Sequence, residues 1–210
     1  MNFFPQLSLT ALESAYPYPI PSDHSSNLQP LVAQLLRTFS AASVLPHISE
    51  EEISLIAYLS IFHDIGKQVI PAAILNKPGK LSPEEYAQMK SHTTEGCKLL
   101  ESIPGLRQSP VFDLLYDICR HHHERWDGKG YPDGLSGSQI TPYVHVIGLA
   151  DVYDALRTPR PYKLPLSHQE AMSLICSGAC GAFAPEMLGY FQRYMKDAPP
   201  LVYKEVSKVG

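Results

Sequence analysis

Apolar positions along this chain recur at the period of an α-helix. From Leu31 to Phe39 they fall three or four residues apart, and the segment 53–62 is apolar nearly all round, as in a helix at the centre of a bundle. No stretch shows the sustained alternation of apolar and polar residues that marks a half-buried strand. The pattern therefore predicts an all-α protein.

Capping signals predict where these helices begin. A serine followed three residues later by glutamate is a capping box, and such pairs precede several of the apolar stretches. Because proline is tolerated in the first turn of a helix but not in its interior, Pro30 requires Asn27 to be the N-cap of the first helix. We expect the helix that begins after Ser82 to run on without a break to Ile103. The expected starts are Asn27, Ser49, Ser82, Ser109, Thr141, Ser167 and Pro185.

The distribution of proline divides the chain. Residues 1–22 contain Pro5, Pro17, Pro19 and Pro21, a spacing that excludes a continuous helix, and we expect an irregular arm there. One helical domain is expected over residues 23–197, followed by a short tail at 198–210. A chain of 210 residues is long enough to bury a substantial core in one such domain.

Most of the expected helices carry a histidine or an aspartate on the face that should be apolar. These residues are His63, Asp64, His92, His122 and Asp151. A lone buried histidine is more often satisfied by a backbone carbonyl, but buried carboxylates are almost never found without a cation. Nitrogen and oxygen ligands together suit Fe, Mn, Co, Ni or Zn. The candidate ligands outnumber those of one tetrahedral ion, so we expect two metal ions that share a bridging carboxylate.

Three adjacent histidines, at positions 121–123, are followed by a loop that contains Gly128, Gly130, Gly134 and a proline. Neutral imidazole is the commonest metal ligand in proteins, and glycine allows the backbone to approach a ligand closely. The combination predicts a metal site with a phosphate-sized ligand over it. The alternative is an ordinary surface loop, since glycines alone do not require a ligand.

Composition narrows the partners and the compartment. Seventeen basic and 21 acidic residues give a net charge of −4, which argues against a nucleic acid polymer as partner. No run approaches 18 apolar residues and the N-terminus shows no signal pattern, so we expect a cytoplasmic protein without membrane insertion. The four cysteines lack metal-binding spacing and are expected to be free thiols.

Two motifs resemble the HD-GYP domain family, a branch of the HD metal-dependent phosphohydrolases. They are the segment 63–67, which begins with His63 and Asp64, and the segment 122–132, which ends with Gly130, Tyr131 and Pro132. Further matches lie at residues 70–81, 150–156 and 160–163. The resemblance covers the chain from His24 to Arg193 and slightly beyond.

The resemblance implies an HD-type helical bundle with a C-terminal extension. It implies a phosphodiesterase that hydrolyses cyclic di-GMP to pGpG, and slowly onward to GMP, by attack of a metal-activated hydroxide on phosphorus. The implied cofactors are two divalent transition metals, iron in the first place and manganese in the second. The implied substrate is a cyclic dinucleotide.

Carried over residue by residue, the resemblance also implies individual roles. Asp64 and Lys67 are implied in catalysis, with Asp64 as the bridging carboxylate. Trinuclear members carry a glutamate four residues before the first histidine ligand, and here that position is Ile20, which cannot ligate, so we expect a binuclear site. The implied substrate-binding residues are Lys67, Gly130, Tyr131, Arg160 and Lys163. The implied metal ligands are His24, His63, Asp64, His92, His122, His123 and Asp151.

Two other functions stay open at this point. A non-catalytic module of this family would sense cyclic di-GMP or dock a signalling partner such as a GGDEF-type protein. A related hydrolase would act on a different cyclic dinucleotide. The intact set of implied ligands favours the enzyme that hydrolyses cyclic di-GMP.

Overall fold

The computed structural model describes residues 25–158 and 164–197, and this part of the chain is helical without a β-strand. The all-α prediction is therefore confirmed. The predicted arm at 1–22 and tail at 198–210, together with His24, Arg160 and Lys163, lie outside the described residues. The α-helices are α2 (Ser25–Ala41), α3 (Glu50–Leu59), α4 (Ala72–Leu75), α5 (Pro83–Lys90), α6 (His92–Ser102), α7 (Phe112–His121), α8 (Pro142–Arg157), α9 (His168–Cys176) and α10 (Pro185–Asp197).

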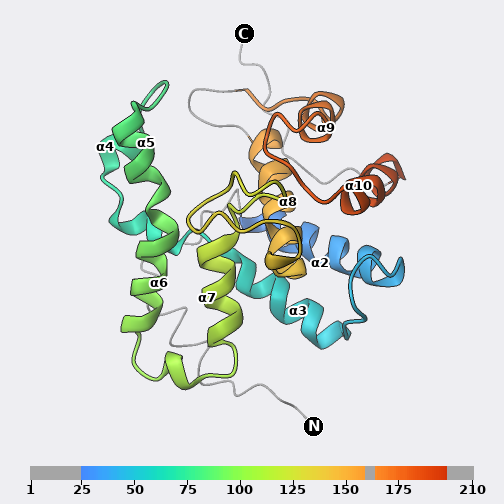
Figure 1. Ribbon diagram of the computed structural model, residues 1–210, viewed down its shortest axis with the longest axis horizontal. Helices are drawn as coiled ribbons and strands as arrows, with labels where there is room; N and C mark the ends of the chain where they lie inside the picture. The colour runs from blue at the N-terminus through green and yellow to red at the C-terminus, as the bar shows by residue number, and fades with distance from the viewer. Residues whose placement is uncertain (1–24, 159–163, 198–210) are drawn as a thin grey trace.

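Short 3₁₀ helices connect several of these elements. They are η1 (Ser60–Phe62), η2 (Ile65–Val69), η3 (Leu106–Gln108) and η4 (Gly137–Gln139). In Figure 1, α8 lies in the middle of the molecule, with α4, α5 and α6 on one side of it and α9 and α10 on the other. None of the helices within the described ranges combines the length and the apolar character needed to cross a membrane.

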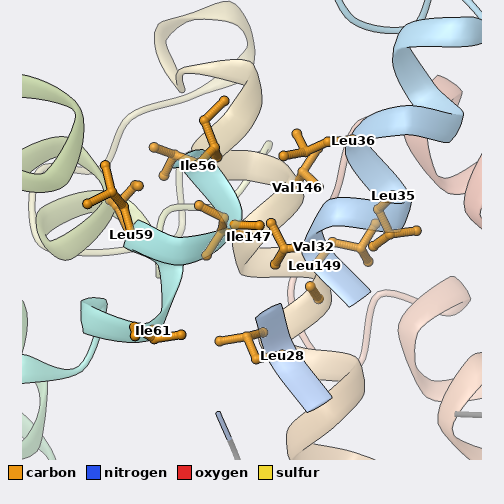
Figure 2. Close-up of a cluster of buried hydrophobic side chains, with 14 of the residues drawn as sticks. Leu28, Val32, Leu35, Leu36, Ile56, Leu59, Ile61, Val146, Ile147 and Leu149 are labelled. Carbon is orange, nitrogen blue, oxygen red and sulfur yellow. The ribbon is translucent and has the colours of Figure 1, made fainter. Parts of the chain in front are cut away.

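The core is built where α2 packs against both α3 and α8. Figure 2 shows side chains from the three helices converging, among them Leu35 of α2, Ile56 of α3 and Ile147 of α8. Each is at most 3% exposed. Burying one such side chain stabilises the fold by about 1.5–3 kcal/mol. The prediction that the apolar segment 53–62 lies at the centre of the bundle is thus confirmed.

The predicted start of the first helix is wrong. We expected Asn27 as N-cap, but α2 already includes Ser25, so Pro30 lies inside the helix. A proline there cannot donate the hydrogen bond to the carbonyl four residues earlier. Leu28, which precedes the proline, is 0% exposed, and its burial together with the rest of the α2 stripe outweighs the lost bond.

The predicted continuous helix from Ser82 to Ile103 is also wrong, because it breaks at Ser91. The amide of Ser91 donates to the carbonyl of Gln88, three residues back, at 3.2 Å, and a new helix starts at His92. The break separates α5, which has no buried residue, from α6, which is buried along one face. It also places His92 in the first turn of α6. The capping boxes at Ser49, Ser82 and Ser167 are confirmed.

Two glycines bring η2 against α6. A Cβ on Gly66 would lie 1.9 Å from the carbonyl oxygen of His92 and 2.5 Å from the amide nitrogen of Gly96. A Cβ on Gly96 would lie 2.4 Å from the Sγ atom of Cys119 on α7. Side chains larger than hydrogen cannot be accommodated at these distances. Glycine at both positions therefore allows η2 to contact the α6 backbone and the Cys119 side chain of α7 to pack on α6.

We predict that Gly66→Ala lowers the free energy of unfolding by about 1–3 kcal/mol, since the added methyl group meets rigid backbone. The melting temperature should fall by several degrees, as measured by circular dichroism. Gly189→Ala is the matched control, because a Cβ there meets nothing within 4 Å and α10 gains helix propensity. Equal effects of the two substitutions would contradict the role assigned to Gly66.

Candidate metal centre

Side chains from four elements meet at one point between the helices. The turn between η1 and η2 supplies His63 and Asp64, and the first turn of α6 supplies His92. The C-terminal end of α7 supplies His122, followed directly by His123, and α8 supplies Asp151. The described residues thus bring together all the predicted ligands except His24. In Figure 1, these four elements lie side by side around the loop that follows α7.

The candidate ligand atoms lie close to one another. The Nε2 atom of His63 is 3.1 Å from Oδ2 of Asp64 and 3.6 Å from Oδ1 of Asp151. The Nε2 atoms of His92 and His122 are 3.3 Å apart, and they lie 3.3 and 3.8 Å from Oδ1 of Asp64. The candidate ligand atoms of Asp64, His92, His122 and His123 are all within 4.8 Å of one another. Such spacing is typical of groups that surround a cation.

Backbone carbonyls fix the orientation of three of the imidazoles. A carbonyl oxygen can only accept, so the Nδ1 atom that contacts it must carry a proton, and in the neutral ring the lone pair is left on Nε2. In each ring it is Nε2 that points into the cluster. The bonds run from His63 to Ser60 (2.7 Å), from His92 to Met89 (2.8 Å) and from His122 to Ile118 (3.0 Å).

Burial holds most of these imidazoles in the neutral form. It is the main reason why the pKa values of His92 and His122 lie below the ordinary range, and it lowers the pKa of His123 to about 3. Burial also tends to lower the pKa of His63, but the carboxylates of Asp64 and Asp151 outweigh it and raise that pKa to about 10. A proton on His63 therefore offsets part of the carboxylate charge, which a divalent cation would offset more completely.

The carboxylate of Asp64 is ionised and incompletely satisfied. Burial tends to raise its pKa, but His63 and Lys67 hold the pKa well below the usual range. Lys67 donates a short hydrogen bond to Oδ2, whereas Oδ1 is buried and has no hydrogen-bond partner among the described residues. An ionised oxygen of this kind is costly unless something positive faces it. The donor set of carboxylates and neutral imidazoles fits a divalent metal ion.

The loop after α7 folds back onto the cluster. The amide of Tyr131 donates to the carbonyl of His123 at 3.3 Å, and the Tyr131 ring stacks on the His123 ring with centroids 4.7 Å apart. A Cβ on Gly130 would lie 2.4 Å from the Cα atom of Glu124, so only glycine permits this return. Both residues were predicted to bind substrate, and in the structure they first of all hold His123 in place.

Glu124 anchors the loop, a role that the sequence analysis missed. It is only 2% exposed, and its Oε1 atom accepts from the amides of Asp133 at 2.7 Å and Gly134 at 3.0 Å. A loop of this length needs acceptors for its amides when it lies against the protein. A glutamate between the histidine pair and the glycine-rich segment was the signal that could have revealed this role.

His121 lies outside the cluster. Its Nδ1 atom is 2.5 Å from Oδ1 of Asp117 and its Nε2 atom is 2.8 Å from Oδ2 of Asp133. Arg120 makes two further hydrogen bonds to Asp133, at 2.7 and 2.8 Å. Of the three adjacent histidines, the first therefore supports the loop and the next two face the candidate metal centre.

Comparison with known proteins agrees with this geometry. A family profile described as "HD domain" matches residues 14–185. The chain belongs to the HD domain family. The fold is similar to a solved structure described as an HDG"Y"P protein from Bdellovibrio bacteriovorus. The TM-score is 0.60 at 19% sequence identity, and the match covers 90% of this chain and 56% of that one. Together with the family match and the curated relatives described next, this likeness in fold confirms the resemblance to HD-GYP proteins.

Curated relatives of this HD domain protein bear names that refer to cyclic dinucleotides. A "Cyclic di-GMP phosphodiesterase" of Thermotoga maritima is 39% identical over 158 residues, which are 75% of this chain and 42% of the relative. A "Probable cyclic di-GMP phosphodiesterase" of Vibrio cholerae is 44% identical over 61% of this chain and 30% of the relative. A "3'3'-cGAMP-specific phosphodiesterase 2" of Vibrio cholerae is 34% identical over 67% of this chain and 26% of the relative. The chain thus spans less than half the length of these relatives.

We predict that His122→Gln lowers the affinity for Mn²⁺ or Fe²⁺ at least about a hundredfold, whereas His121→Gln leaves it within about twofold. The reason is that the Nε2 atom of His122 faces Asp64 and that of His121 faces Asp133. Elemental analysis after dialysis against limiting metal would measure the difference between these neighbouring residues. Equal losses in both variants would contradict the orientation of the two rings.

We predict that Glu124→Ala loosens the loop, because two backbone amides lose a charged acceptor and each such bond contributes about 1.5–3 kcal/mol. Cleavage by trypsin after Lys129 should become about tenfold faster or more under native conditions. Glu124→Gln keeps an oxygen that can accept and is the control. An unchanged cleavage rate in Glu124→Ala would show that the loop does not depend on this carboxylate.

Proposed function

We propose that this protein is a metal-dependent phosphodiesterase that hydrolyses cyclic di-GMP to pGpG, with slow onward cleavage to GMP. The observation that carries the proposal is the convergence of oriented imidazole lone pairs on the ionised, incompletely satisfied Asp64. Catalysis of phosphodiester hydrolysis requires charge stabilisation at a non-bridging oxygen and an activated water, and such a centre supplies both when loaded.

The residues that would hold the metal ions are those of the cluster. Two ions with Asp64 between them match the supply of donors, which exceeds the needs of one tetrahedral ion. The resemblance to the HD-GYP family makes iron the first choice of metal and manganese the second, and imidazole and carboxylate together suit both. The proposed ligands are His63, Asp64, His92, His122, His123 and Asp151, with His24 as a further candidate.

The bound ions would supply Lewis acidity, which lowers the pKa of water and offsets charge on the phosphate. Lys67 lies at the rim of the centre, with its ammonium group on Asp64 and its side chain 36% exposed. It is therefore placed to meet a phosphate that enters from solvent and to offset the charge that spreads over its oxygens. Arg160 and Lys163, which lie outside the described residues, are proposed for the same role because of the resemblance to the HD-GYP family.

The choice of cyclic di-GMP rests on the names of several relatives. Hydrolysis of 3′3′-cGAMP is the second candidate, since three relatives are named for that substrate and two of them align with two thirds of this chain. A non-catalytic sensor or a module that docks a GGDEF-type protein is a less favoured alternative, because a binding module would not need oriented metal ligands.

We predict that Asp64→Ala lowers the rate of cyclic di-GMP hydrolysis about a thousandfold or more, since the loss of a bridging ligand removes several kcal/mol of transition-state stabilisation. Turnover would be followed by chromatography of pGpG with metal-loaded protein under reducing conditions. Asp113→Ala, an exposed position on α7, is the control and should keep full activity.

A wild-type protein that holds its metal and returns cyclic di-GMP unchanged would contradict the proposed reaction. Faster turnover of 3′3′-cGAMP than of cyclic di-GMP would assign the second substrate instead.

A further inference from the structure

A row of aromatic rings and one cation leads from the metal centre to the surface. The His123 ring stacks on Tyr131 at 4.7 Å. The Nζ atom of Lys90 lies over the Tyr131 ring, 5.7 Å from its centroid, and also over the Tyr86 ring, 5.3 Å from its centroid. Lys90 thus joins α5 to the loop after α7, and Tyr86 ends the row on the outside.

The outer end of this row is exposed to solvent. Tyr86 is 51% exposed, although most aromatic side chains in the described residues are packed against neighbours. Tyr86 and Lys90 are four residues apart on α5, a helix without a buried residue, so they share one face. An exposed aromatic face held beside a fixed cation is a surface on which a nucleobase can stack.

Lys90 forms no salt bridge with a carboxylate in the described part of the chain, whereas Lys67 does. The lysines Lys67, Lys77, Lys98 and Lys129 each pair with an acidic side chain. The ammonium of Lys90 instead faces two electron-rich rings, which keep it in place and leave its donors open to a ligand. Donors of this kind bind anions or strong acceptor groups.

Position decides between a phosphate and a base as the partner of Lys90. Lys90 contacts the Tyr131 ring, which in turn stacks on the proposed metal ligand His123, so Lys90 is set back from the centre at which the phosphate would react. A base attached to that nucleotide extends away from the phosphate. Among the purines, guanine presents two acceptors, O6 and N7, on one edge, whereas adenine presents an acceptor and an amino donor.

We propose that Tyr86 and Lys90 form a base subsite that selects guanine in the nucleotide undergoing hydrolysis. Tyr86 provides the stacking face, Lys90 donates to O6 and N7 of guanine, and Tyr131 fixes the position of Lys90. The inference rests on the proposed function, which it deepens by stating how the base is recognised. It predicts that a cyclic dinucleotide without guanine is a poor substrate.

The test compares cyclic di-GMP with cyclic di-AMP on metal-loaded protein. The wild type should prefer cyclic di-GMP by at least about tenfold in kcat/KM, the magnitude expected of one lysine contact to guanine. Lys90→Met should reduce that preference about fivefold or more with unchanged metal content, and Lys90→Arg should retain it. Lys98→Met, which removes a 68% exposed lysine of α6, is the control and should leave the preference unchanged.

The stacking face is tested separately. Tyr86→Ala should raise KM for both dinucleotides about tenfold with little change in kcat, and Tyr86→Phe should behave like the wild type. Equal losses on both substrates in Lys90→Met would indicate a contact to phosphate and overturn the assignment. An unchanged preference in Lys90→Met, or a wild type without preference for guanine, would overturn it as well.

Failure of the subsite and failure of the proposed reaction are distinguishable. If the metal-loaded protein turns over neither substrate, the same preference is measured as a ratio of dissociation constants by equilibrium dialysis. A guanine preference in binding that Lys90→Met removes would then support the subsite while contradicting the hydrolysis. Absence of binding, or binding without preference, would overturn the subsite.

Discussion

The structure depends on one electrostatic constraint, the shielding of two aspartates from water in the middle of a helical core. The side chains of Asp64 and Asp151 are only 13% and 12% exposed, and they lie within 3.6 Å of the same imidazole nitrogen of His63. Two ionised carboxylates in such surroundings repel each other and lose hydration. Positive charge is the remaining way to stabilise them. The protonated His63 and Lys67 provide part of it, and a bound cation would provide the rest.

Interruptions of regular helix bring the ligands to this point. The end of α3 tightens into η1, so that His63 and Asp64 follow a 3₁₀ turn, and the break at Ser91 starts α6 at His92. The end of α7 releases His122 and His123 into a loop. Each interruption turns an imidazole towards the centre. It also leaves a backbone carbonyl free to accept the hydrogen bond that the Nδ1 atom of that imidazole donates. The breaks are therefore part of how the metal ligands are oriented.

Much of the fold and of the cluster was predictable from the sequence. Capping boxes at Ser49, Ser82 and Ser167 are local signals with a local cause, and the apolar segment 53–62 could only be a central helix. The break at Ser91 was not predictable in this way, because the residues around it favour helix and tertiary packing of η2 against α6 decides the outcome. The start of the first helix was predicted wrongly at Pro30 because tertiary burial of the apolar α2 residues, and not local propensity, decides where that helix begins.

The different positions of the three adjacent histidines could not be predicted from the sequence alone. Helical phase alone did not separate His121 from His122, since the helix ends between them. What separates them is a pair of carboxylates that hold His121 on the outside: Asp117, one helical turn earlier, and Asp133, twelve positions later in the loop. Long-range pairs of this kind are visible only once the loop has been placed.

The loop after α7 couples the metal centre to the surface. Glu124 holds the loop's backbone, Gly130 lets it return, and Tyr131 then lies flat on His123. Since the ring of Tyr131 also faces Lys90, a displacement of the loop would move both a metal ligand and a cation at the rim. The segment Gly130-Tyr131-Pro132 therefore contacts the candidate metal centre through one imidazole and the surface through one ammonium group. An effect of this segment on a metal bound at the centre would arise from the positioning of His123.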